Sequence, residues 1–265
     1  MAMHGARWRW LGCLFAFCLS GVSQGDTLQL YTEEYPPMNF AREGRPTGMA
    51  VDLVRELLAR TGDGARIHLV PWARAYREAQ GEAGNGVFVT MRTAEREKLF
   101  KWVGPVAVVI TSFYALKGSG IRVESLEQAG KLGSIAVPRQ WYSYQELRAR
   151  GLNNLYAVSG PQQMMDMLRH RRVPVVVADN VTLESLLALG GLRLEEVEPL
   201  YGFLRSEAYI AFSPATDDRL IAQWQQALDS MKADGSFALI YRRWLPGSDL
   251  PPGLITLPEE SSLAH

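Results

Sequence analysis

The chain has 265 residues, and its 28 Lys and Arg side chains balance 28 Asp and Glu side chains, so the formal net charge is zero. This length allows one large domain or two of ordinary size, and the 47% hydrophobic content is normal for a globular protein with a sizeable core. The neutral balance argues against nucleic acid as a partner, because phosphate binding leaves a basic footprint. Beyond residue 25 no window is apolar enough to span a bilayer.

The N-terminal segment differs from the rest of the chain. Arg7 and Arg9 precede an apolar run over residues 11–22, and the small residues Ser23 and Gly25 follow it. The pattern predicts a secretory signal peptide cleaved after Gly25; an uncleaved membrane anchor is the alternative. Both cysteines lie inside this segment, so the mature chain is expected to have no disulfide and, with 26 basic against 28 acidic residues, a charge of −2. We therefore expect a secreted, soluble product.

The first half of the mature chain alternates strands with helices. The hydrophobic patterns predict strands at 28–31, 67–70 and from 87 onwards, helices over 50–62 and 71–79, and an extended segment over 102–114. Two prolines in the 32–40 loop exclude regular structure there, so the aromatic and acidic residues of this loop sit on a stiff backbone. Such a loop could line a pocket, or Tyr35 and Phe40 could simply pack against the core.

The second half repeats this alternation from about residue 123. Strands are predicted at 134–137, 155–158, 173–178 and 209–212, and helices at 125–128, up to 147, 161–170, 220–231 and 236–244. Residues 195–205 are weakly patterned and are predicted to be partly strand, and the Pro-, Ser- and Glu-rich tail over 251–265 is expected to be loose. Strands alternating with helices predict the α/β class, with a parallel sheet covered by helices.

The stretch over residues 87–96 carries the clearest functional pattern. An apolar strand leads to Thr93, which is a good helix N-cap, and the switch carries Thr90, Arg92 and Arg96. A strand end, the free amides of a helix start and a guanidinium together make an anion site. The alternative is that both arginines lie on a solvated surface.

The order of several short motifs resembles the bacterial extracellular solute-binding proteins of family 3, the polar-amino-acid receptors of ABC importers. The matching stretches are TEEYPP at 32–37, RPTGMAVDLVREL at 45–57, RTAEREK at 92–98, SIAV at 134–137, VAD at 177–179, and MKADGSF at 231–237 with YRRW at 241–244. The resemblance implies the type II periplasmic-binding-protein fold, in which two α/β lobes are joined by two crossing hinge strands and a ligand cleft lies between them.

The resemblance also implies how the chain divides. Residues 26–108 and 206–250 would form a discontinuous lobe 1, and residues 109–205 would form lobe 2. The signal peptide (1–25) precedes them and the flexible tail (251–265) follows.

The resemblance also implies ligand-binding roles for particular residues. Arg96 matches the arginine that grips the ligand's α-carboxylate, Asp179 the carboxylate that takes the α-ammonium, and Tyr35 the aromatic that stacks on the ligand. Trp141 and Tyr142 fall at the lobe 2 helix start that meets the ligand carboxylate. A guanidinium suits carboxylate because it offers a planar bidentate fork. The residues alone favour a different interpretation, in which Asp179 is only an N-cap of the following helix.

Other candidates depart from the family pattern. Receptors of the family usually carry Thr or Ser five residues before the arginine; here Met91 stands there and the hydroxyl is at Thr90. Trp72 and Phe88 are either ligand platforms or core residues. The loss of the usual hydroxyl at position 91 favours a ligand that is a more apolar or aromatic zwitterion, or a small organic anion.

Two classes of function follow. The first is a periplasmic receptor, expected to be a monomer, that delivers its ligand to a membrane ABC permease. The second is an enzyme on the same scaffold, resembling cyclohexadienyl dehydratase, for which Glu33 and Glu34 are the carboxylates near the mouth of lobe 1; a sensory role is a third possibility. No metal-ligand spacing, phosphate loop or catalytic triad pattern is apparent, so we expect no cofactor, no metal and no enzymatic activity.

Overall fold

The computed structural model describes residues 27–246, 250 and 254. The predicted signal peptide (1–25) lies outside the described residues. So does the predicted tail (251–265), apart from Leu254, whose side chain is fully buried in the hydrophobic core.

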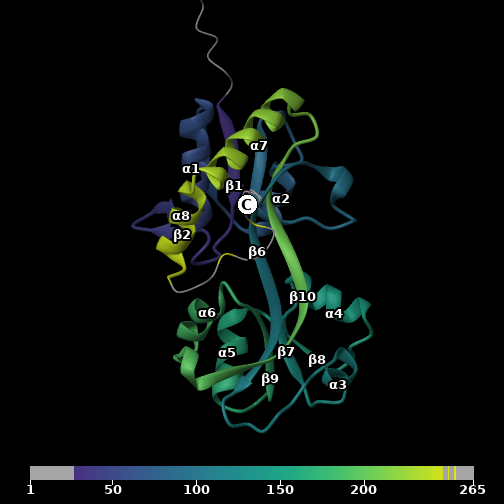
Figure 1. The fold of residues 1–265 in the computed structure, drawn as a ribbon. Coiled ribbons are helices and arrows are strands. Elements are labelled where there is room, and N and C mark those ends of the chain that lie inside the picture. Colours follow the sequence, from purple (N-terminus) through teal and green to yellow (C-terminus); the bar gives the residue numbers. More distant parts are fainter. Residues whose placement is uncertain (1–26, 247–249, 251–253, 255–265) are drawn as a thin grey trace, which may run out of the picture.

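One eight-stranded sheet runs through the whole molecule in the order β4-β1-β5-β10-β6-β9-β7-β8 (Figure 1). Its strands are β1 (Leu28–Thr32), β4 (Ala65–Leu69), β5 (Asn85–Met91), β6 (Lys101–Leu116), β7 (Ile135–Pro138), β8 (Leu155–Val158), β9 (Val175–Asp179) and β10 (Val197–Phe212). A separate hairpin is formed by β2 (Phe40–Arg42) and β3 (Arg45–Thr47).

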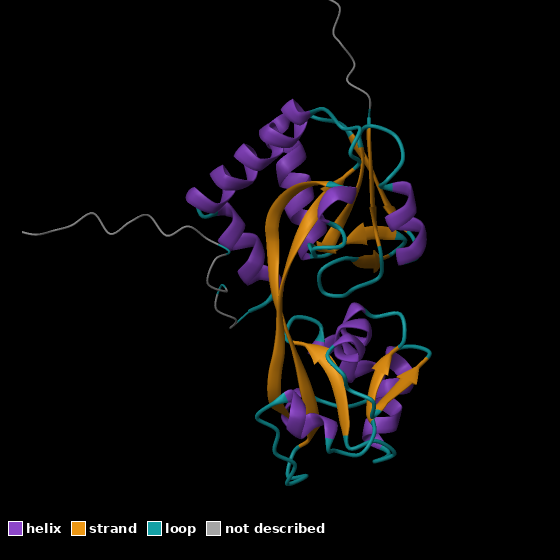
Figure 2. Cartoon of the chain, turned by 90° about the vertical axis from the view of Figure 1, so that its right-hand side faces the viewer, coloured by secondary structure: helices purple, strands orange, loops and turns teal. Residues whose placement is uncertain are grey.

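The strands β6 and β10 join the two halves of the molecule. They pair antiparallel along their lengths, from Leu116 opposite Val197 to Lys101 opposite Phe212. Figure 2 shows them passing from the upper lobe to the lower one. The predicted type II fold with two crossing hinge strands is confirmed, and the predicted lobe boundaries at 108/109 and 205/206 fall inside these two strands.

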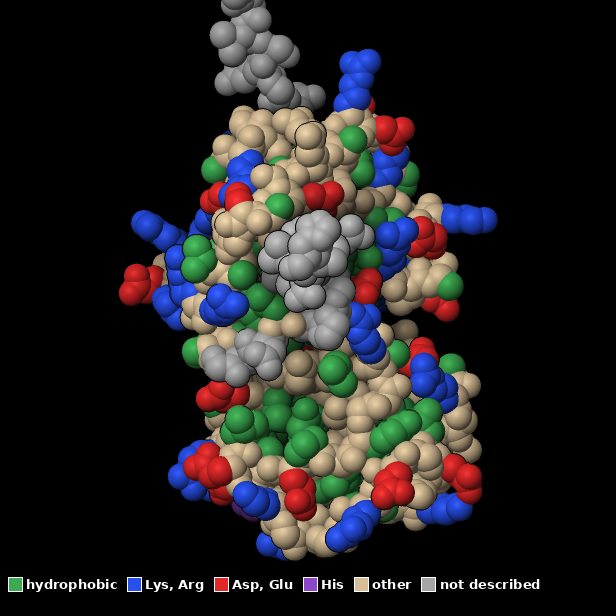
Figure 3. All heavy atoms as spheres, viewed as in Figure 1, with side chains coloured by type: hydrophobic (Ala, Val, Ile, Leu, Met, Phe, Trp, Pro, Cys, Tyr) green, Lys and Arg blue, Asp and Glu red, His purple; other side chains and the backbone are tan. Residues whose placement is uncertain are grey.

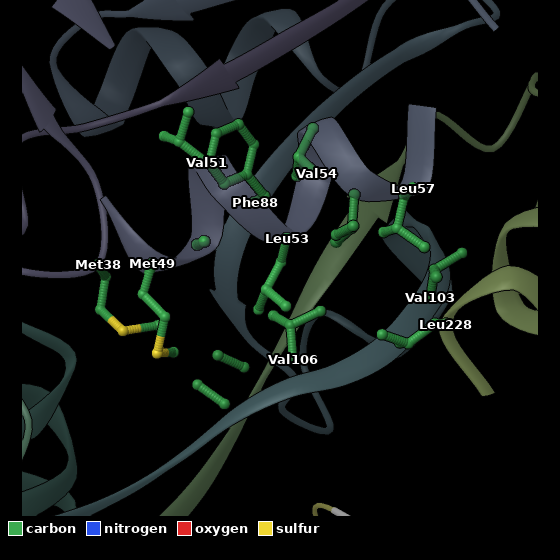
Figure 4. Packing of buried hydrophobic residues seen from close by; sticks show 14 of the residues in the cluster. Met38, Met49, Val51, Leu53, Val54, Leu57, Phe88, Val103, Val106 and Leu228 are labelled. Atoms are coloured by element: carbon green, nitrogen blue, oxygen red, sulfur yellow. The ribbon is translucent and has the colours of Figure 1, made fainter. Parts of the chain in front are cut away.

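Lobe 1, as named here, comprises β1–β5 and the helices α1 (Met49–Thr61), α2 (Trp72–Glu78), α7 (Asp218–Ala233) and α8 (Ser236–Trp244), together with the upper parts of β6 and β10. Alternate residues of each strand face opposite sides of the sheet. Leu30 and Phe88 therefore belong to the buried cluster that includes α1, α7 and α8, and Figure 4 shows Phe88 beside residues of α1. Tyr31 and Val87 pack against α2 on the other side. This double cover requires the nearly continuous apolar runs seen in the sequence.

Lobe 2 comprises β7–β9 and the helices α3 (Leu126–Gly130), α4 (Tyr142–Ala149), α5 (Pro161–Arg169) and α6 (Leu183–Leu189), together with the lower parts of β6 and β10. Along β9, Val176 and Ala178 pack towards α5 and α6, while Val175 and Val177 pack on the other side. The methionines of α5 lie in this core. Hydrophobic side chains also gather over α5 and α6 on the face shown in Figure 3, and Leu189 at the end of α6 is exposed.

One local prediction is wrong and another is confirmed. No helix begins at Thr93; a turn is followed by the 3₁₀ helix η1 (Glu97–Leu99), and no side chain caps that helix. The apolar spacing over these residues is too short to support an α-helix. Residues 195–205 are partly strand, as predicted: after the 3₁₀ helix η2 (Leu194–Glu196) the chain enters the first half of β10, where cross-strand pairing with β6 outweighs the weak local preference.

No helix in the described part of the chain has the length and hydrophobicity needed to cross a membrane.

Candidate functional site

The candidate site is built from three loops at one edge of the sheet. The strands β4, β1 and β5 are parallel neighbours, so their carboxyl ends lie at the same edge. The loops that leave this edge begin at Glu33, Val70 and Arg92. In open α/β sheets, ligands bind outside the carboxyl ends of the strands, so the topology brings these loops to the place where a ligand is expected.

A β-bulge in β5 sets the direction of the last of these loops. Phe88 lies opposite Ile210 and Thr90 lies opposite Tyr209, so two steps along β5 match one step along β10. The extra residue is Val89, which has a φ of 61°, an uncommon and strained value for a β-branched side chain. The bulge turns Thr90 and Met91 relative to the rest of the strand. Strain of this kind persists where the surrounding structure enforces it, often beside a functional site.

Arg96 is held by neutral groups. Its Nη1 donates to the carbonyl oxygen of Met91 at 3.2 Å, and its Cζ lies 5.4 Å from the ring centre of Trp72 and 5.3 Å from that of Tyr76. The side chain is half-buried, and within the described residues it has no ion pair with a carboxylate. Two aromatic faces and a carbonyl orient the guanidinium and leave most of its five N–H donors for another partner.

Arg92, four residues earlier, is a contrasting case. Its Nε and Nη2 donate to the two carboxylate oxygens of Glu97 at 2.7 and 2.6 Å, so its fork is already occupied. The same guanidinium lies over the rings of Trp102 and Tyr209. Of the two arginines that the sequence singled out, Arg96 is therefore the one with free donors for an anion.

Asp179 lies where the two lobes meet. Its Oδ2 accepts from the Tyr35 hydroxyl of lobe 1 at 2.6 Å and from the Thr182 hydroxyl at 2.7 Å, and its Oδ1 accepts from the backbone amides of Val181 and Thr182 at 3.0 and 2.9 Å. Burial and the adjacent Asp179 raise the pKa of Tyr35 well above its ordinary value, so Tyr35 remains a hydrogen-bond donor. Asp179 therefore stabilises the turn before α6 and, through Tyr35, also connects the two lobes.

Tyr142 and Trp141 lie on the lobe 2 side of the same region. Tyr142 begins α4, and its hydroxyl is 2.8 Å from the Thr111 hydroxyl of β6 and donates to the Ser206 hydroxyl of β10 at 3.3 Å. Thr111 is also paired with Asp179 in the sheet. Tyr142 thus links the start of α4 to both hinge strands, while Trp141 packs against the two hydrophobic clusters of lobe 2.

Four other predicted site residues are occupied by internal contacts. Phe88 is 1% exposed and packs in the core of lobe 1 (Figure 4). Thr90 is fully buried and its hydroxyl donates to the Val87 carbonyl at 3.3 Å; the Met91 side chain is buried, so this residue faces Arg96 through its carbonyl. Glu34 is exposed, and its carboxylate accepts from the Ala41 amide at 3.0 Å.

Glu33, in contrast, has a free side chain. It follows β1 directly and is half-buried, and in the described part of the chain its carboxyl has no hydrogen bond or ion pair. Burial raises the pKa of this carboxyl to about 7, from an ordinary value of 4.5. The backbone beside it is fixed, because Asn39 Nδ2 donates to the Glu33 carbonyl and the Val70 amide donates to the Thr32 carbonyl at 2.9 Å.

Sequence reasoning missed two members of this region. Tyr76 forms the second ring beneath Arg96, and its spacing of four residues from Trp72 on α2 is the signal that would have identified it. Thr182 supplies a hydroxyl and an amide to Asp179, and no sequence feature distinguishes it from an ordinary threonine before a helix. In the described chain no group of three His, Cys, Asp or Glu side chains is arranged to hold a metal ion.

The sequence of this chain matches a known protein family. The profile of the bacterial extracellular solute-binding proteins, family 3, matches residues 29–247, which is most of the chain. The chain belongs to this family. The resemblance inferred from the short motifs is therefore confirmed.

Several solved structures share the fold of this chain. A histidine kinase sensor domain with similarity to periplasmic binding proteins superimposes with a TM-score of 0.74 at 19% identity, covering 86% of this chain and 99% of that one. An ancestral arginine-binding protein bound to arginine gives 0.68 at 22% identity, covering 82% and 97%.

An ancestral amino acid-binding protein described as a precursor of cyclohexadienyl dehydratase gives a TM-score of 0.68 at 20% identity, covering 82% of this chain and 94% of that one. At these identities the likeness concerns the fold alone. No curated protein matches the chain.

Proposed function

We propose that this protein is a periplasmic receptor that captures a small zwitterionic or anionic organic solute, an amino acid or a related compound, and delivers it to a membrane ABC permease. The observation that supports this most directly is Arg96, whose oriented guanidinium has no carboxylate partner among the described residues. It stands at the edge of the lobe 1 sheet from which the Tyr35 loop reaches lobe 2. A planar fork of this kind matches a carboxylate.

Capture would proceed by closure of the lobes. The ligand carboxylate binds Arg96 on lobe 1, and contacts with the Trp141–Tyr142 helix start on lobe 2 favour the closed arrangement. A ligand shifts such an equilibrium only through contacts that differ between the open and closed forms. The contacts of Tyr142 support this proposal. Its hydroxyl forms hydrogen bonds with both strands that join the lobes, so the start of α4 is coupled to them.

A thermal-shift screen of the mature protein against the twenty standard amino acids and a set of small organic acids tests the proposal, with affinities of the hits measured by calorimetry. Substitution Arg96→Ala removes the free fork and is expected to weaken binding about 100-fold, the equivalent of about 2.7 kcal/mol. Arg92→Ala is the matched control, because it removes an arginine of the same loop whose fork is already occupied by Glu97. Equal losses in both variants, or no hit in the screen, would contradict the proposal.

A dehydratase remains the second candidate because of one observation. Glu33 is a half-buried carboxyl whose pKa lies near 7, the value expected of a general acid or base. Incubation of the protein with prephenate, followed by chromatography of the products, separates the two functions. Turnover that is lost in Glu33→Gln would establish the enzyme, and binding without turnover would favour the receptor.

A further inference from the structure

We propose that Glu33, rather than Asp179, receives the ammonium group of the ligand. The inference rests on the proposed receptor function and adds to it that the ligand is an amine-bearing carboxylate whose two charged groups are both read by lobe 1. It moves the amine site from the end of β9 in lobe 2 to the end of β1 in lobe 1.

The first reason is that Asp179 has no acceptor position to spare. Each carboxylate oxygen offers about two lone-pair sites, and both oxygens of Asp179 already accept two hydrogen bonds. An ammonium group that bound there would have to displace the hydroxyl of Tyr35 or Thr182, or a backbone amide. Each displaced donor in this buried position would lose a charge-assisted bond, so the exchange brings little net gain.

The second reason is that Glu33 is the carboxyl of this region with free acceptors. Its neighbour Glu34 bonds to the Ala41 amide and faces solvent, whereas Glu33 is half-buried without a partner in the described chain. A buried carboxylate without a partner is costly, and a ligand ammonium would repay that cost. The raised pKa of Glu33 reflects the same cost, because burial alone accounts for it.

The third reason is that the backbone holds Glu33 in place. Thr32 is fully buried, with its hydroxyl donating to the Phe88 carbonyl at 3.3 Å and its carbonyl accepting from the Val70 amide. Asn39, also fully buried, donates through Nδ2 to the Glu33 carbonyl, and its Oδ1 has no partner. A binding group is effective when the residues around it fix its position, and here both flanks of Glu33 are bonded to neighbouring segments.

The fourth reason is the placement of Glu33 relative to Arg96. Both side chains follow parallel strands of lobe 1 at one edge of the sheet, and β1 is the direct neighbour of β5. Arg96 is a cation and Glu33 becomes an anion when its carboxyl ionises, yet in the described chain neither forms an ion pair with the other or with any third residue. Two unpaired groups of opposite sign on one rigid edge suit a zwitterion, whose carboxylate and ammonium satisfy both.

The test compares amino acids with analogues that lack only the amine. The probes are L-phenylalanine with 3-phenylpropionate, L-arginine with 5-guanidinopentanoate, and L-glutamine with glutaramate, measured by calorimetry on the wild type and on Glu33→Gln, Glu34→Gln and Asp179→Asn. For the pair that the wild type binds, Glu33→Gln is expected to weaken the amino acid 10- to 100-fold and to leave the amine-free analogue unchanged, which also shows that the variant is folded. Glu34→Gln should change neither affinity.

The outcomes separate this inference from the receptor function. Asp179→Asn is expected to lower the melting temperature while keeping the preference for the amine. If Asp179→Asn abolishes that preference and Glu33→Gln does not, the amine site is at Asp179 and the inference is overturned. If the wild type binds an amino acid and its amine-free analogue equally, the inference also fails but the receptor remains. If none of the twenty standard amino acids and none of the small organic acids of the screen binds the wild type, both proposals fail; if only amine-free acids bind, the inference fails and the receptor remains.

Discussion

Replacing Glu33 by Gln should stabilise the protein at neutral pH in the absence of ligand. The glutamine side chain has the shape of a protonated glutamate, so it removes the charge and keeps the volume. Burial without a partner disfavours the ionised form of Glu33, which is why its pKa is raised to about 7. A residue kept for binding at the expense of stability is expected to respond in this way.

The size of the stabilisation expected for Glu33→Gln follows from the linkage between proton binding and folding. The pKa of Glu33 is 4.5 in its ordinary state and about 7 in the fold, so between these values the folded protein binds more protons than the unfolded chain. Its free energy of unfolding therefore falls as pH rises, by about 1.4 kcal/mol per pH unit from this residue at most. Because the side chain is partly exposed, we expect the advantage of Glu33→Gln to grow from near zero at pH 4.5 to about 1–3 kcal/mol at pH 8.

Urea unfolding followed by tryptophan fluorescence at pH 5, 6, 7 and 8 measures this difference. Glu34→Gln is the control, since that side chain is exposed and a glutamine oxygen can still accept from the Ala41 amide. The control and the wild type should respond to pH alike, whereas Glu33→Gln should diverge upwards. If the unfolding midpoints of Glu33→Gln and the wild type run parallel from pH 5 to 8, Glu33 is not a buried, unpaired carboxyl and the reasoning fails.

Further substitutions test the contacts between and within the lobes. Tyr35→Phe removes the hydrogen bond to Asp179 that crosses between the lobes, and Thr182→Val removes a hydrogen bond to the same oxygen inside lobe 2. Each should lower the free energy of unfolding by about 1.5–3 kcal/mol, but only Tyr35→Phe should increase the radius of gyration in small-angle X-ray scattering. Trp224→Ala should lower the free energy of unfolding by about 3–5 kcal/mol in calorimetry, because the fully buried ring packs on Phe212 and its Nε1 bonds to Asp63 at 2.7 Å. A loss below 1 kcal/mol would show that lobe 1 tolerates the cavity.

The elements with a full periodic pattern were predictable from the sequence. The helix ending at Gly62 and the Met-rich α5 agree with their predicted positions, because burial of one continuous apolar face demands that spacing. The first half of β10 was barely predictable, because its partner residues in β6 lie 81 (Val197 and Leu116) to 95 (Arg205 and Ile110) positions away in the chain and the pairing supplies its stability. The expected helix at Thr93 failed for a related reason: a cap residue without an apolar face behind it does not make a helix.

The candidate site was also predictable only in part. The sequence by itself determined which residues are candidates for contact with a small charged ligand, including Arg96, Trp72, Tyr35 and Asp179, because their types were recognisable by their order along the chain. Only the tertiary structure decided which of them are free. Hydrogen-bond partners come from segments far apart in sequence. The hydrogen bond from Tyr35 to Asp179, and the lack of a partner for the Glu33 carboxyl among residues 27–246, 250 and 254, therefore became visible only in the folded chain.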